Sequence, residues 1–225
     1  MSGTVFLIDL DNTLFDHDAF KKELGNWLSR QGDACAGPGP FWDLYEEIRS
    51  TTGIVDIPLT VERYSARHAG PVFAEAFHQF VWEFPYDRLI YPGALRALES
   101  LAALGRAAVV CDGSPLHQSH KARVSGVAER VGHRIHVFGH KEHHIPEILA
   151  TYPADGYVLV DDKPRIHLAF KDALGDAITT VLVDQGRYAA AAGDAPPGVD
   201  LRVPAVGCIP ALLPASLEGI HRGPG

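Results

Sequence analysis

Short apolar runs recur along the chain, and each one ends in polar or turn-forming residues. Runs of this length, bounded by turn signals, are typical of strands that are buried on both faces of a parallel sheet. A weaker run near the end of the chain predicts an additional edge strand. The runs that predict strands are residues 5–8, 107–111, 134–138, 156–160 and 179–183, with the edge strand at 201–203.

Between the first two runs the apolar residues change from the strand period to the helix period, which predicts four helices. The first begins near Asp16 and ends at Gly32, and the run Gly37-Pro38-Gly39-Pro40 marks a break before the second. All three tryptophans and six of the ten phenylalanines lie in this stretch, so we expect an aromatic helical core. The other helices are expected at about 41–50, 59–68 and 71–82, the last with Val72, Phe73, Ala76, Phe77 and Phe80 facing inward.

The remaining apolar runs alternate with helical patterns. Such alternation predicts right-handed crossovers and a three-layer α/β/α sandwich around a parallel sheet. We expect the first strand to be central, with the second and third on one side and the fourth and fifth on the other. Residues 1–15 and 88–225 then form the core, and residues 16–87 form an inserted helical unit. One helix is expected at 94–104, with Leu95, Leu98, Leu101 and Leu104 facing inward.

Residues 185–199 are rich in glycine, alanine and proline, which predicts a surface loop with a short helix near Tyr188. The last dozen residues carry no chemistry that we can identify.

Composition narrows the range of partners. The 225 residues, 46% of them hydrophobic, suffice for one large domain or a domain with an insertion. A formal net charge of −8 without any Lys/Arg-rich run argues against nucleic acid or an anionic membrane as the main partner. No apolar run approaches the roughly 20 residues of a membrane span, and no signal peptide pattern is present. Three widely spaced cysteines fit a reducing compartment, so we expect a cytoplasmic protein, either a monomer or a homodimer.

The most informative stretch follows the first apolar run, where Asp9 and Asp11 flank Leu10. Asn12 and Thr13 are turn formers, so the strand ends there. Two carboxylates at this spacing repel each other unless a cation lies between them. Hard oxygen ligands suit Mg²⁺, and ligands of open α/β sheets bind at this edge of the sheet. A strand that simply ends in solvated acids is the alternative interpretation.

Polar groups follow three later strands in the same way. They are the turn 111–114, the residue Lys141, and the pair Asp161-Asp162. Because the carboxyl ends of parallel strands meet at one edge of the sheet, we expect these groups to share a site with Asp9 and Asp11.

The stretch Asp9-Leu10-Asp11-Asn12-Thr13 behind a hydrophobic strand resembles motif I, Asp-x-Asp-x-Thr, of the haloacid dehalogenase-like (HAD) superfamily. The resemblance implies a Rossmann-like core and a helical cap that closes over the site and selects the substrate. It implies that Asp9 is a nucleophile that forms an aspartyl-phosphate, and that Asp11 is the general acid/base. Dehalogenases of the superfamily lack the second acid, because a halide leaves without a proton. Asp11 therefore favours phosphoryl chemistry.

Motif II of the superfamily places Ser or Thr at the end of the second core strand, and this chain has Cys111 there. A thiol is a weak donor, so Ser114 in the turn is the alternative for this role, and a small buried core residue is the alternative interpretation of Cys111. The amides of Asp112 and Gly113 offer further donors to a phosphoryl group. The resemblance also places Thr13 among the phosphate-binding residues.

Lys141 matches motif III, whose lysine neutralises the phosphoryl group and the nucleophile. Lys121, on the helix after the second strand, is the alternative candidate for this role. His140 is expected closest to the substrate among five histidines between residues 133 and 144, whose spacing fits neither a zinc finger nor a helical His pair.

Asp161 and Asp162 match motif IV. By resemblance Asp162 is the direct Mg²⁺ ligand, and Asp161 binds through water or holds Lys141. His167 stands near the position where other members carry a further acid. The motif therefore does not determine which neighbouring groups orient the metal ligands.

Together these motifs predict a Mg²⁺-dependent hydrolase of a small phosphorylated metabolite, acting through an aspartyl-phosphate. The metal set would be Asp9, Asp161, Asp162 and the backbone carbonyl of Asp11. A phosphotransferase or phosphomutase on the same fold is one alternative. A binding or regulatory protein that keeps the scaffold without turnover is another.

Overall fold

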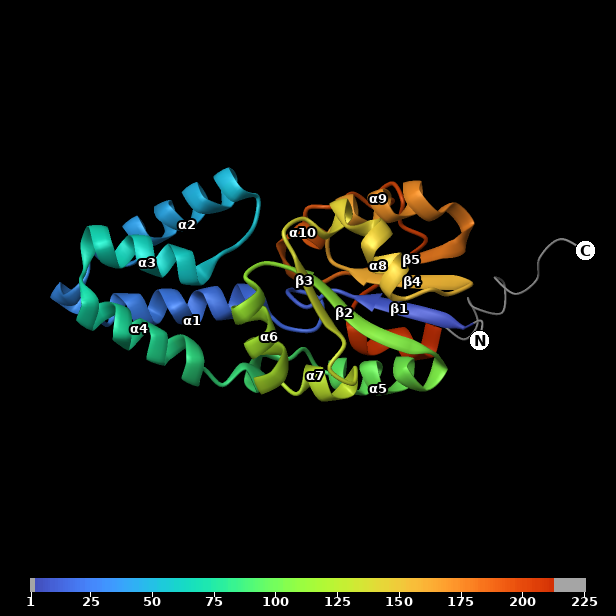
Figure 1. Ribbon diagram of the computed structural model, residues 1–225, viewed down its shortest axis with the longest axis horizontal. Coiled ribbons are helices and arrows are strands. Elements are labelled where there is room, and N and C mark those ends of the chain that lie inside the picture. Colours follow the sequence, from blue (N-terminus) through green and yellow to red (C-terminus); the bar gives the residue numbers. More distant parts are fainter. Residues whose placement is uncertain (1–2, 213–225) are drawn as a thin grey trace, which may run out of the picture.

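The first apolar run lies in the middle of a parallel sheet (Figure 1). The structure, a computed structural model, describes residues 3–212. The strand order is β3-β2-β1-β4-β5-β6, and β1 pairs in parallel with both β2 and β4, so the predicted α/β class and strand order are confirmed. The strands are β1 (Thr4–Ile8), β2 (Arg106–Asp112), β3 (Ile135–Phe138), β4 (Gly156–Asp161), β5 (Ile178–Val183) and β6 (Leu201–Val203).

Helices bury both faces of the sheet, because side chains of a strand point alternately to opposite sides. On one face Phe6 of β1 packs in a cluster with Leu98. On the other face Leu7 packs in a second cluster with Phe170. The first face is covered by α5 (Ala94–Leu104), α6 (Pro115–Val124) and α7 (Val127–Arg130), and the second by α8 (Ile145–Thr151) and α9 (Pro164–Leu174).

Four helices between β1 and α5 lie together at one end of the molecule, beside the sheet (Figure 1). Their shared interior is aromatic: Trp27 stacks on Phe80 with ring centroids 5.1 Å apart, and Phe41 stacks on Phe77 at 5.7 Å. We call them the four-helix segment. Its members are α1 (His17–Ser29), α2 (Pro38–Thr52), α3 (Ile57–His68) and α4 (Pro71–Glu83).

The remaining helices are short. They are α10 (Gly186–Ala190) and the 3₁₀ turns η1 (Gly32–Ala34), η2 (Tyr86–Leu89), η3 (Lys141–His143), η4 (Gly175–Ala177) and η5 (Val206–Cys208).

The two chain connections to the four-helix segment run side by side. Phe15 and Ile90 form an antiparallel bridge. The Tyr91 amide donates to the Leu14 carbonyl at 2.9 Å, and the Asp16 amide donates to the Leu89 carbonyl at 2.8 Å. The Asp16 carboxylate then caps α1 by accepting from the Ala19 amide at 2.8 Å. This pairing fixes where α1 leaves the sheet.

Several details differ from the sequence-based expectations. Helix α2 begins at Pro38, because Gly37 takes the turn at φ 81° and proline is well suited to a first helical turn. Val72 was expected inward but is 81% exposed, since the buried face of α4 follows Phe73 and Phe77. Leu104 was also expected inward but is 50% exposed, because it is the last residue of α5 before the chain turns into β2.

The last dozen residues, for which the sequence indicated no chemistry, lie outside the described part of the chain. Within residues 3–212, none of the helices has the length and apolar character needed to cross a bilayer.

The turn from α5 into β2 gives a test of the packing. A Cβ at Gly105 would overlap the backbone carbonyl oxygen of Thr4, whereas one at Gly156 would meet nothing within 4 Å. We predict that Gly105→Ala lowers the free energy of unfolding by about 1–3 kcal/mol, measured by urea denaturation. Gly156→Ala is the control, and equal stabilities of the two variants would contradict the predicted clash.

Candidate active site

Three carboxylates meet where β1 and β4 end. Ile8 pairs with Val160 in the sheet, so the next residues, Asp9 and Asp161, emerge side by side. The Asp9 amide continues the ladder by donating to the Val160 carbonyl at 2.9 Å. Asp9, Asp161 and Asp162 are all buried, and each offers a ligand atom within 4.8 Å of the others. We call these three residues the carboxylate cluster.

Lys141 joins two members of the carboxylate cluster. Its ammonium nitrogen lies 2.6 Å from Asp9 Oδ1 and 2.6 Å from Asp161 Oδ2, and it donates to the Val110 carbonyl at 2.9 Å. Burial disfavours a charged lysine, but Asp161 and Asp9 raise the pKa of Lys141 above its ordinary value. Lys141 is therefore a fixed positive charge inside the site.

Lys163 is a second cation beside the carboxylate cluster, and it was not predicted from the sequence. Its Nζ lies 3.6 Å from Asp9 Oδ2 and 3.9 Å from Asp162 Oδ1. Although burial acts against the charged form, the surrounding carboxylates raise its pKa well above the ordinary value. A lysine after an acidic pair is common on solvated surfaces, so its place in the sequence alone carries little signal.

Several carboxylate oxygens of the cluster lack hydrogen bonds. Asp9 Oδ2 and both oxygens of Asp162 are buried and have no hydrogen-bond partner among residues 3–212. Burial, reinforced by Asp161 and Asp9, raises the pKa of Asp162 well above its ordinary value, while Lys163 opposes the rise. Buried carboxylates without partners are costly, so this oxygen set fits a hard divalent cation.

The Asp11 side chain has separate partners from those of the cluster. It accepts hydrogen bonds from Lys121 at 2.6 Å and from Gln118 at 2.8 Å, both on α6. Although burial acts to raise it, Lys121 lowers the pKa of Asp11 well below its ordinary value. The two lysines that competed for one role in the sequence thus pair with different acids, Lys141 with Asp9 and Lys121 with Asp11.

His17 is a further group that sequence reasoning missed. Its Nδ1 lies 3.6 Å from Asp11 Oδ2, and neither ring nitrogen has a hydrogen-bond partner within the described residues. Burial lowers the pKa of His17 to about 4, although Asp11 opposes the shift. It begins α1, where its amide donates to Asn12 Oδ1 at 3.1 Å.

The turn after β2 is arranged differently from the expectation. Cys111 is buried in the apolar cluster below the sheet, and burial raises the pKa of its thiol. The Gly113 amide donates to the Phe138 carbonyl at 3.0 Å, so this amide extends the β2–β3 ladder and the expectation that it serves an anion was wrong. Asp112 is used structurally, since its carboxylate accepts the Lys141 amide at 2.7 Å.

A cavity of about 510 Å³ reaches the carboxylate cluster at Asp9, whereas Asp161, Asp162 and Lys141 are not part of its lining. Asp9, Asp11, Asp112 and Lys163 line it from the sheet, whereas Thr13, Cys111, Gly113 and Ser114 are absent from its lining. Ser114 instead lines a separate depression beside the start of α3. The remaining walls come from the four-helix segment with its α2–α3 connection, from the turn after β3, from the start of α9 and from α10. Those residues are His17, Asp18, Tyr45, Arg49, Gly53, Ile54, Val55, His140, Glu142, His143, Arg165, Arg187 and Tyr188, with Asn12 from the turn after β1.

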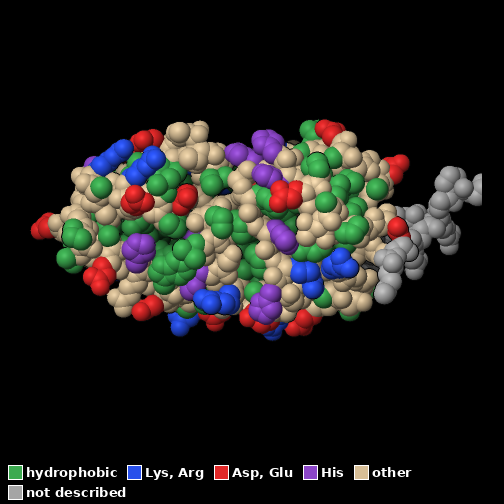
Figure 2. Space-filling view, in the orientation of Figure 1, with side chains coloured by type: hydrophobic (Ala, Val, Ile, Leu, Met, Phe, Trp, Pro, Cys, Tyr) green, Lys and Arg blue, Asp and Glu red, His purple; other side chains and the backbone are tan. Residues whose placement is uncertain are grey.

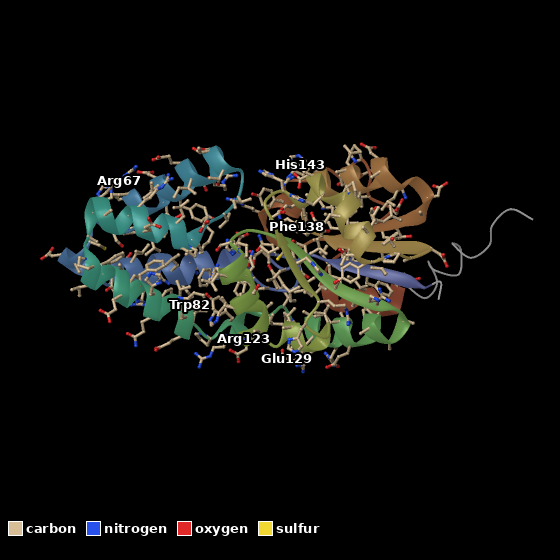
Figure 3. The ribbon with its side chains drawn as sticks, in the orientation of Figure 1. Arg67, Trp82, Arg123, Glu129, Phe138 and His143 are labelled. Carbon is tan, nitrogen blue, oxygen red and sulfur yellow. The ribbon has the colours of Figure 1, made fainter. Side chains whose placement is uncertain are left out.

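His140 and His143 lie where the core faces the four-helix segment, and Figure 3 labels His143 there. Figure 2 shows histidine side chains gathered along this part of the surface. His140 adopts φ 69° and its ring lies against Gly53, at a distance that leaves no room for a Cβ there. His140 therefore stands at the rim of the cavity, beside the end of α2.

Comparison with known proteins gives the family. No protein-family model matches the sequence, and no curated protein matches it. Among solved structures, a protein of Burkholderia xenovorans described as a haloacid dehalogenase-like hydrolase is 31% identical, with a TM-score of 0.84 over 96% of this chain and 99% of that one. The chain therefore belongs to the haloacid dehalogenase-like hydrolase superfamily.

Two more distant structures share the fold. The L-2-haloacid dehalogenase of Xanthobacter autotrophicus is 18% identical, with a TM-score of 0.55 over 95% of this chain and 99% of that one. A HAD hydrolase of Bacillus subtilis that is bound to magnesium is 14% identical, with a TM-score of 0.66 over 95% of this chain and all of that one (100%). A haloacid dehalogenase and a magnesium-bound hydrolase are thus both among the structures that share this fold.

The shared ammonium of Lys141 gives a stability test. We predict that Lys141→Met lowers the free energy of unfolding by about 3–5 kcal/mol, because it leaves Asp9 and Asp161 buried without their common partner. The measurement is urea denaturation at neutral pH in EDTA. Lys22→Met, at an exposed position of α1, is the control. Equal stabilities of Lys141→Met and the control would contradict this assignment.

Proposed function

We propose that the protein is a Mg²⁺-dependent phosphatase that hydrolyses a small phosphate monoester. The observation that carries the proposal is the presence of two acids of different kinds at the end of β1. Asp9 belongs to the carboxylate cluster, with a buried oxygen that has no hydrogen-bond partner among the described residues. Asp11 faces the same cavity with separate partners. A nucleophile and a separate proton carrier are what ester cleavage requires, and a dehalogenase needs only the first.

The residues present fit a magnesium ion. Asp9 and Asp162 would hold it through their unpartnered oxygens, together with the backbone carbonyl of Asp11. Bound there, Mg²⁺ supplies positive charge that stabilises the phosphoryl oxygens during transfer. Asp161 is engaged by Lys141 at 2.6 Å, which gives it a supporting role.

The protein's own groups would carry out two half-reactions. An Asp9 carboxylate oxygen attacks phosphorus, the ester P–O bond breaks, and the leaving oxygen takes a proton from Asp11. Water then attacks the aspartyl-phosphate while Asp11 accepts a proton from it, which releases inorganic phosphate and restores Asp9. Lys141 keeps the nucleophile oriented through its 2.6 Å contact with Asp9 Oδ1.

The contact with Lys121 stabilises the ionised form of Asp11. An ionised carboxylate is the form that accepts a proton from water in the second half-reaction. In the first half-reaction the carboxyl must carry a proton. A phosphate dianion that approaches Asp11 raises its pKa, because a nearby like charge disfavours the ionised form. Substrate charge and the Lys121 ammonium thus act in opposite directions on the same proton.

The four-helix segment, residues 16–87, acts in this proposal as a cap on the core formed by residues 1–15 and 88–225. Two features support it. Tyr45 and Arg49 of α2 line the cavity above the carboxylate cluster, and the paired connections at Phe15 and Ile90 give the segment a defined attachment. A cover of this kind excludes water from the reacting groups.

Removing the nucleophile gives the first test of the proposal. We predict that Asp9→Asn abolishes Mg²⁺-dependent hydrolysis of p-nitrophenyl phosphate while the protein stays folded, as checked by circular dichroism. Asp11→Asn is expected to reduce kcat by about 10²–10⁴-fold. Full turnover by Asp9→Asn would refute the nucleophile assignment. Release of chloride from 2-chloropropanoate, without phosphate ester hydrolysis, would favour the dehalogenase instead.

The metal assignment has a test that does not need turnover. Lys163 lies between Asp9 and Asp162, where its charge competes with a bound cation. We predict that Lys163→Met binds Mg²⁺ about tenfold more tightly than the wild type, by titration calorimetry. Lys22→Met is the matched control with unchanged affinity. Weaker Mg²⁺ binding by Lys163→Met would contradict a shared cation position.

A further inference from the structure

The wall of the cavity formed by α2 and α10 carries polar groups that the proposed phosphatase chemistry does not use. Tyr45 is 2% exposed and lines the cavity, yet its hydroxyl has no hydrogen-bond partner among residues 3–212. Its position beside an open volume means that a ligand can supply the missing partner. Burial raises the pKa of Tyr45 above its ordinary value, so the hydroxyl keeps its proton and can donate it.

Two arginines share this wall. Arg187 of α10 donates from its guanidinium to the Tyr188 hydroxyl at 3.1 Å, and no carboxylate lies within ion-pair distance of it among the described residues. Arg49 of α2 uses Nε for Glu46 at 2.6 Å, and its two Nη groups make no hydrogen bond or ion pair within the described part of the chain. A guanidinium offers a planar fork of donors that matches carboxylate and phosphate groups.

A third cation lies behind this wall. Lys21 Nζ is 4.5 Å from the centre of the Tyr45 ring. Burial lowers the pKa of Lys21, and Arg187 and Arg49 add to that effect, while Glu46 and Asp18 oppose it. Asp18 is itself engaged by the Arg187 amide at 3.2 Å. Around Tyr45 three cations therefore lie beside two carboxylates, and Asp11, the next acid, is already paired with Lys121.

From these contacts we infer that the cavity holds a second anion subsite, formed by Tyr45, Arg49 and Arg187. The inference rests on the proposed function and narrows its substrate class. The substrate is a short organic phosphate ester that bears another anionic group, either a carboxylate or a second phosphate. Ile54 and Val55 line the same cavity and suit a short carbon chain between the two groups. A volume of about 510 Å³ limits the ligand to a small molecule.

The experiment compares three substrates with the same three-carbon chain: propyl phosphate, 3-phosphonooxypropanoate and propane-1,3-diyl bisphosphate. The wild-type enzyme with Mg²⁺ is expected to show a kcat/KM at least about tenfold higher for one of the two doubly anionic esters than for propyl phosphate. The preferred ester identifies the anionic group as a carboxylate or a phosphate.

Variants then assign the preference to residues. Arg187→Met and Arg49→Met are each expected to lower the ratio of the two kcat/KM values toward one, mainly through KM. Arg187→Lys is expected to restore part of the ratio, since it keeps the charge and loses the fork. Arg63→Met, at an exposed position of α3 outside the cavity lining, is the matched control and keeps the wild-type ratio.

The outcomes separate the two proposals. Hydrolysis of all three esters with equal kcat/KM overturns the subsite and leaves the phosphatase intact. A clear preference that survives both arginine variants also overturns the subsite. Failure to hydrolyse the three esters and p-nitrophenyl phosphate refutes the phosphatase, and the subsite falls with it. Hydrolysis of p-nitrophenyl phosphate alone overturns only the subsite.

Discussion

Electrostatic repulsion among three buried carboxylates is the constraint around which this site is arranged. Asp9, Asp161 and Asp162 are brought together because β1 and β4 are neighbours that end at the same edge of the sheet. Lys141 and Lys163 offset part of that repulsion. Two ammonium groups face three acids, and the pKa of Asp162 is raised well above its ordinary value, so a cation bound at its oxygens would relieve the repulsion. The geometry of a parallel sheet thus places three acids together at one edge, where their oxygens fit a divalent cation.

Much of the core was predictable because each strand is a short apolar run buried on both faces, and such runs are distinct in the sequence. The position of a polar residue directly after a run was equally informative. It identified Asp9, Asp11, Lys141 and Asp161 as members of one edge of the sheet, and the structure places them there. Chain order and the sheet are enough for this inference, since neither depends on how the side chains pack.

Side-chain pairing was harder to predict. Both Lys121 and Lys141 were candidates for the lysine of motif III, because the sequence alone does not show which lysine reaches which acid. In the structure Lys121 contacts Asp11 and Lys141 contacts Asp9. Lys163 and His17 were missed since their sequence neighbourhoods resemble solvated surface. The amide of Gly113 was misjudged because its use depends on how far the β2–β3 ladder extends. Burial and ladder length are tertiary properties, and they decide which polar groups remain open to a ligand.

The side-by-side course of the two connections at Phe15 and Ile90 has a consequence for how such proteins diversify. The chain departs from the sheet and returns to it at adjacent positions, held by hydrogen bonds between Tyr91 and Leu14 and between Asp16 and Leu89. The intervening helices therefore form a unit whose two connections to the sheet lie next to each other. Replacing that unit would leave the strand order and the acidic edge unchanged, so the same sheet could carry helical insertions of different size and charge.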